Sequence, residues 1–270
     1  MNEPNDEVDV VLKRINDIIG DCVRDTHRAE RVPLTSLQSC FHSLGSAMWS
    51  YPKTGLRESL LFCRTLEWIE IIVWSQIAIL SGVYESAIRE LRYLLEDVLV
   101  SAIADKRNPA GSIEDKLKIV EELGREKPPK RGGGLIRLCR ELGIIRNDEI
   151  KRILQEQYNR LCDFAHPSRE IVERRIGHER DFRFSFDPER YNHTVGLYVK
   201  TVDCLLLVIF WQMDDDAQVV FANWFCSIAS YNQDFIETER VCRPIERKWW
   251  KDVTEDLMQQ FDESRNTEPE

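Results

Sequence analysis

The sequence is poor in the two residues that interrupt regular structure. Its 270 residues include only 12 glycines and 10 prolines. We therefore expect no long disordered region away from the chain ends. The exception is the tail, 263–270, whose polar sequence predicts disorder.

A long charge-free apolar run is also lacking. The two most apolar segments, 59–80 and 194–213, are both interrupted by charges: Arg64, Glu67 and Glu70 in the first, Lys200 and Asp203 in the second. Because a membrane-spanning helix needs about 20 predominantly apolar residues, we expect both to be buried helices. The acidic start, MNEPNDEVDV, has no signal-peptide pattern. These features predict a cytoplasmic protein with no membrane association.

Positive charge is in deficit. The formal net charge is −10 and the pI is about 5.2, which argues against wholesale coating of nucleic acid by a basic domain. A local basic groove remains compatible with this composition.

The eight cysteines form no CxxC pair and most have apolar neighbours at helical positions. Reduced thiols in the core are therefore expected. No local spacing suggests a zinc site, and we expect neither a metal nor a cofactor.

Helical periodicity dominates what is present. In 83–105, apolar residues alternate three and four apart, as in a helix that faces a core: Ile88, Leu91, Leu95, Val98 and Ala102. Further helices are predicted at 6–26, 33–48, 56–80, 113–123, 134–142, 147–165, 188–212, 215–230 and 244–261. Only 181–186, DFRFSF, alternates as a strand would. The fold class is all-α, a multi-helix bundle.

Polar caps and glycines mark the ends of these helices. Ser112, Asn147 and Asp187 with Pro188 precede predicted starts, and Gly82, Gly124 and Gly143 follow predicted ends. We expect N-terminal helices in 1–55, a helical core in 56–215 and C-terminal helices in 216–262 that pack on the core.

The clearest interruption is 124–134, GREKPPKRGGG, which is also the most basic short stretch. It is either a solvated linker or a mobile loop that contacts phosphate. It lacks the GxxxxGK[ST] pattern and a preceding strand, so a nucleotide P-loop is not indicated.

One stretch contains residues that suggest a catalytic site. In EQYNRLCDFAHPS (156–168), Arg160 precedes His166 by six residues and Pro167 follows. Proline disfavours helical geometry in the residue before it, so the helix should end near His166 and free its ring to turn toward Arg160. Imidazole can take and return a proton near neutral pH, and guanidinium binds phosphate oxygens. This pair suits metal-free cleavage of an RNA phosphodiester.

The arginine–x5–histidine pattern at a helix end in an all-α chain resembles the HEPN superfamily (higher eukaryotes and prokaryotes nucleotide-binding). The segments SAIRELRYLLEDVL and YNRLCDFAHPS carry this resemblance, which spans roughly 60–215. It implies a HEPN-like core with Arg160 and His166 as catalytic residues of a metal-independent endoribonuclease. Active members usually form homodimers and occur in toxin–antitoxin, phage-defence and RNA-processing systems, where an antitoxin or other protein can be a partner. Leu161 stands where active members often have a polar residue.

Three interpretations of the pair stay open. It can act on RNA, with Arg169, Arg174 and Arg175 holding the backbone, or bind a ligand without cleavage. Alternatively it is structural within a non-catalytic helical interaction module. Arg160 would then pair with Glu156 or Asp163, and His166 would cap the last turn.

Other chemistry-bearing residues have simpler explanations. His27 and His42 lack acidic partners at ligand spacing, and His178 lies in a segment of nearly balanced charge. The run 214–216, DDD, is expected to begin a helix. Trp249 and Trp250 either stack on bases or dock the C-terminal helix on the core.

Overall fold

The computed structural model describes residues 6–29, 58–125, 133–165, 186–229 and 236–266. Within these ranges the chain forms ten helices and no strand, so the predicted all-α multi-helix bundle is confirmed. The predicted helix 33–48 lies outside the described residues. So does the predicted strand at 181–186, apart from Phe186.

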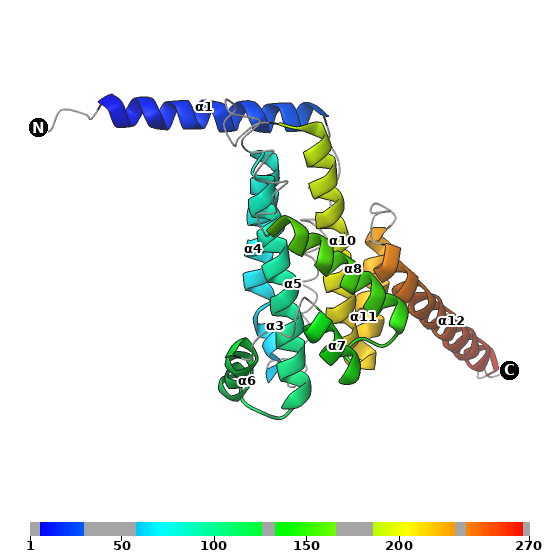
Figure 1. Ribbon diagram of the computed structural model, residues 1–270. Helices are drawn as coiled ribbons and strands as arrows, with labels where there is room; N and C mark the ends of the chain where they lie inside the picture. The colour runs from blue at the N-terminus through cyan, green and yellow to red at the C-terminus, as the bar shows by residue number, and fades with distance from the viewer. Residues whose placement is uncertain (1–5, 30–57, 126–132, 166–185, 230–235, 267–270) are drawn as a thin grey trace, which may run out of the picture.

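α5 (Tyr84–Arg107) is the central helix of the bundle (Figure 1). α4 (Thr65–Leu80) packs along one side of it, and α8 (Asp148–Ala165) and α10 (Pro188–Gln212) pack against it as well. The short helices α3 (Leu60–Cys63), α6 (Ile113–Arg125) and α7 (Gly133–Glu141) contact its C-terminal half. α11 (Asp215–Ala229) and α12 (Ile236–Asn266) pack on each other and against α10.

α1 (Asp6–Ala29) lies across one end of the bundle. Its contact with α4 includes the Thr26 hydroxyl, which donates to the carbonyl oxygen of Leu80 at 3.4 Å. The N-terminal half of α1 and the C-terminal half of α12 both extend away from the bundle (Figure 1).

The predicted apolar stripe of α5 forms the middle of the core. Leu91, Leu95, Val98 and Ala102 have no exposed surface, and Ile88 is 2% exposed. One cluster of buried side chains continues from Leu61 in α3 to Cys242 in α12. The C-terminal helices therefore share a core with the central bundle.

α10 is the one described helix that is long and apolar enough to cross a membrane by length and composition. However, 78% of its apolar window is buried inside the molecule. It occupies the position of a core helix, as predicted for this segment.

Most predicted helix ends are confirmed by hydrogen bonds. Asn147 Oδ1 accepts from the backbone N–H of Ile150 at 2.8 Å, and Asp187 caps α10 by accepting from two backbone N–H groups. Gly82 and Gly143 adopt φ of 73° and 72°, the left-handed conformation that favours glycine after a helix. Gly124 was wrongly predicted as a helix exit, because α6 continues to Arg125.

The predicted helix 56–80 is interrupted, and α3 and α4 meet at Arg64. The start of α3 is fixed by Asp105 of α5, whose carboxylate accepts from the backbone N–H groups of Leu60 and Leu61 at 2.8 and 3.0 Å. The ammonium group of Lys116, whose side chain is 2% exposed, contacts the same carboxylate at 3.1 Å. These contacts come from residues more than 40 positions away, so a local pattern could not indicate them.

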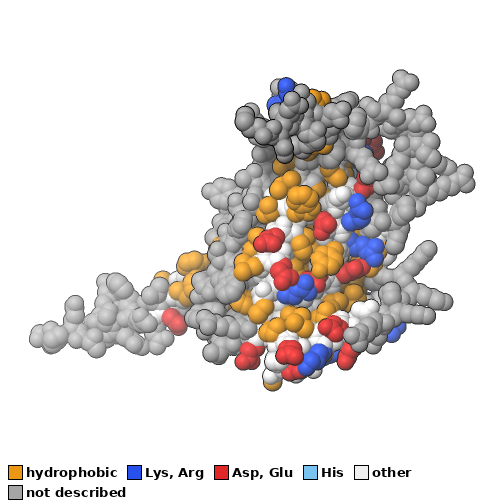
Figure 2. All heavy atoms as spheres, turned by 90° about the vertical axis from the view of Figure 1, so that its left-hand side faces the viewer, with side chains coloured by type: hydrophobic (Ala, Val, Ile, Leu, Met, Phe, Trp, Pro, Cys, Tyr) orange, Lys and Arg blue, Asp and Glu red, His pale blue; other side chains and the backbone are white. Residues whose placement is uncertain are grey.

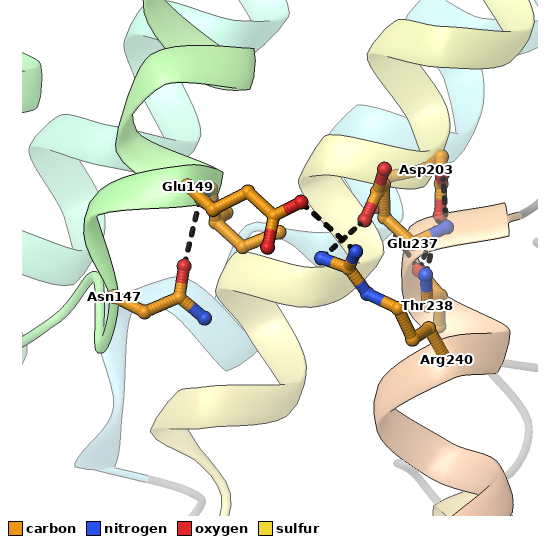
Figure 3. A network of polar contacts seen from close by, with 7 residues as sticks. Asn147, Glu149, Asp203, Glu237, Thr238 and Arg240 are labelled. Carbon is orange, nitrogen blue, oxygen red and sulfur yellow. Dashed lines mark hydrogen bonds and ion pairs between the residues drawn. The ribbon is translucent and has the colours of Figure 1, made fainter.

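α12 begins at Ile236, eight residues before the predicted start at 244, and Pro244 lies inside it. Figure 3 shows the reason: Asp203 of α10 reaches the first turn of α12. Its carboxylate accepts from the backbone N–H groups of Glu237 and Thr238 at 3.0 and 2.9 Å, and from the Thr238 hydroxyl at 2.6 Å. Burial raises the pKa of Asp203 above the usual value for a carboxyl group, while the hydrogen bond from Thr238 opposes this shift.

Arg240 connects the same turn of α12 to α8 (Figure 3). Its guanidinium pairs with Glu149 at 3.0 Å and with Glu237 at 2.8 Å. The beginning of α8 is thereby placed beside the beginning of α12.

The described cysteines are free thiols, and five of the seven are buried: Cys22, Cys139, Cys204, Cys226 and Cys242. This confirms the prediction for those five. Cys63 differs, because it is exposed on α3. Burial raises the pKa of Cys139 to about 12, so this thiol is a core residue and not an activated nucleophile.

Candidate functional site

α8 carries Arg160 on its solvent side near its C-terminal end. Leu161, the next residue, has no exposed surface, whereas Arg160 is exposed. In the sequence of the predicted helix 147–165, Arg160 falls beside the apolar stripe and not in its middle, and its exposure agrees with that position. His166, Arg169, Arg174 and Arg175 lie outside the described residues. Their placement relative to Arg160 therefore stays a prediction.

The ion pairs expected from a purely structural role of Arg160 are absent from the described part of the chain. Glu156 pairs with Arg152, one turn earlier on the same helix. Neither Glu156 nor Asp163 forms an ion pair with Arg160 among the described residues. The guanidinium of Arg160 is therefore not held by either carboxylate that the sequence offered on α8.

A polar cluster near Arg160 joins α8 to α5. The Tyr158 hydroxyl donates to the Glu96 carboxylate, and Arg92 Nε pairs with Glu96 at 3.1 Å. The Arg92 guanidinium also lies 5.8 Å from the centre of the Tyr158 ring, within cation–π range. Burial, together with the bond to Glu96, raises the pKa of Tyr158. The phenol stays protonated, so the cluster positions α8 and supplies no nucleophile.

α10 runs antiparallel to α8 and packs against it. Gln157 Nε2 donates to the carbonyl oxygen of Leu197 at 2.9 Å and to the Thr201 hydroxyl at 2.7 Å. Further down, the guanidinium of Arg146 donates to the carbonyl oxygen of Trp211 at 3.0 Å. These pairings fix the register of the two helices.

This register brings a second histidine to the level of Arg160. Arg160 follows Gln157 by one helical turn, and His193 precedes Leu197 by about one turn. Because the helices are antiparallel, both steps lead toward the same end of the pair, and both residues are exposed. Rotation by 100° per residue turns both toward the same side of the α8–α10 pair.

Among the described residues, nothing covers the surface beside Arg160 and His193. Gly196 of α10 is exposed, and a Cβ placed there would meet no atom within 4 Å. Lys200, one turn further, is half-exposed. Asp163 of α8 and Glu189 of α10 are also exposed, so this strip carries charges of both signs.

His193 belongs to no sequence motif, so the sequence alone does not indicate it as a site residue. Its position becomes meaningful only through the contact of Gln157 with Leu197, 40 residues apart. The one available signal was its place on the polar side of the amphipathic first turns of 188–212.

The remaining candidates keep their simpler roles. Asp214 caps α11 by accepting from the backbone N–H of Ala217 at 2.9 Å, so 214–216 begins a helix as predicted. Across the described ranges, no group of three or more His, Cys, Asp or Glu residues could hold a metal ion. The central part of the loop 124–134 lies outside the described residues, as do the side chains of His27, His42 and His178.

The tryptophan pair lies near the middle of α12. The two rings meet edge to face with centroids 4.8 Å apart. Trp250 is 54% exposed and Trp249 is half-buried. Trp249 is thus the more buried of the two rings, and the role of the pair stays a prediction.

Comparison of the chain with protein-family models, with curated proteins and with solved structures finds no match.

Proposed function

We propose that this protein binds RNA and cleaves it without a metal ion, with His166 as acid and base and Arg160 as the phosphate-binding residue. The observation that supports this proposal is the state of Arg160. It is exposed near the end of α8, and neither neighbouring carboxylate of that helix pairs with it. A cation on an open surface is available to a phosphate group.

The reaction needs only protein groups. His166 takes the proton of a ribose 2′-OH, and the oxygen attacks the adjacent phosphorus. Arg160 stabilises the charge that builds on the phosphoryl oxygens. The bond to the 5′-oxygen breaks, and this oxygen leaves with a proton returned by the imidazolium. The products are a 2′,3′-cyclic phosphate and a 5′-hydroxyl. Arg169, Arg174 and Arg175 contact the backbone on either side.

The cellular role that fits this activity is a toxin–antitoxin or phage-defence system, in which a protein partner controls the nuclease. Such control would keep an RNA-cleaving enzyme inactive until it is needed. This assignment comes from the resemblance to HEPN proteins.

The test is incubation of the purified full chain with mixed RNA in EDTA, beside His166→Ala and Arg160→Ala. We expect cleavage by the wild type and a loss of about 10²–10⁴-fold in rate for His166→Ala, the typical contribution of a general acid or base. Arg137→Ala is the control, since Arg137 is an exposed arginine on α7 that has no contact with Glu156 or Asp163 among the described residues. Cleavage that persists in His166→Ala would refute the assigned chemistry.

Binding is measured separately by fluorescence anisotropy of labelled single-stranded RNA. Binding without cleavage in the wild type would assign ligand recognition alone. His193→Ala shows whether the histidine of α10 belongs to the same surface. If the wild type neither binds nor cleaves RNA, the RNA function is excluded.

A second function, a non-catalytic interaction module, is favoured by a different observation. α4 presents large apolar side chains to solvent, including Leu66 and Trp74, which are 51% and 56% exposed. Contiguous apolar surface on a helix face is typical of a protein-binding site. In that case Arg160→Ala and His166→Ala would leave partner binding unchanged.

A further inference from the structure

We draw no further inference here: the strongest candidate, the exposed apolar face of α4 around Leu66, Trp74 and Ile77 (Figure 2), carries nothing because no described part of the structure shows what covers it.

Discussion

Asp203 in the middle of α10 accepts hydrogen bonds from both the hydroxyl and the backbone N–H of Thr238, at 2.6 and 2.9 Å. The two residues are 35 positions apart. A side chain of one helix therefore performs the N-terminal capping of another, a role that usually belongs to the residue just before the helix.

The first prediction concerns this contact. Asp203→Asn replaces one carboxylate oxygen by an N–H donor that faces other donors. We expect a loss of about 1–3 kcal/mol in the free energy of unfolding, measured by urea denaturation. Asp256→Asn, at an exposed position on α12, should change it by less than about 0.5 kcal/mol. A double-mutant cycle with Thr238→Val should show coupling; additive effects would contradict a direct contact.

The second prediction concerns Lys116, whose ammonium group contacts the Asp105 carboxylate and the carbonyl oxygen of Glu58 at 3.1 and 2.6 Å. Lys116→Met leaves a largely buried carboxylate without its cation. Removal of one partner of a buried ion pair costs about 3–5 kcal/mol. Lys118→Met is the control, because Lys118 is exposed and its loss should cost less than about 1 kcal/mol. Equal effects of the two substitutions would refute the role assigned to Lys116.

The third prediction concerns alkaline pH. The pKa of Cys139 is raised by burial from 9.0 to about 12, so the unfolded chain loses this proton first. Its contribution to stability is complete below pH 9 and is lost as the pH rises toward 12. By pH 10 the wild type should lose roughly 1 kcal/mol relative to Cys139→Ala. Urea denaturation of both proteins between pH 7.5 and 10.5 measures this difference; parallel curves would contradict it.

The fourth prediction concerns Pro244, which lies inside α12 and is exposed. Proline cannot donate a hydrogen bond to the carbonyl group four residues earlier, here that of Arg240. Pro244→Ala should therefore raise the melting temperature, with a gain of about 1–3 kcal/mol. A lower melting temperature would mean that Pro244 is needed for α12 to pack along α11.

The parts of the fold that depend on local pattern could be predicted. The stripe of α5 repeats with the helical period, and Asn147 and Asp187 lie beside the N–H groups that they cap. The break at Arg64 and the early start of α12 could not. The start of α3 at Leu60 and the start of α12 depend on Asp105 and Asp203, which act across 44 and 35 positions.

In the candidate site, too, some features could be predicted from local sequence pattern and others depend on contacts between distant residues. The exposure of Arg160 follows from its place beside the apolar stripe of 147–165, a pattern that the sequence alone shows. The position of His193 next to Arg160 along the helix axes follows from the register of α8 and α10. Gln157 sets this register, and no local sequence signal indicates it. The remaining predicted site residues lie in 166–185, outside the described ranges.

The two distant aspartate caps have a consequence for the order of assembly. The backbone N–H groups of Leu60 and Leu61 in α3, and of Glu237 and Thr238 in α12, reach these acceptors only after the segments that carry Asp105 and Asp203 have become helical and have packed against them. In a kinetic experiment, substitutions at these aspartates should accelerate unfolding and leave the refolding rate nearly unchanged. The central helices would thus form the nucleus, and the peripheral ones would join it late.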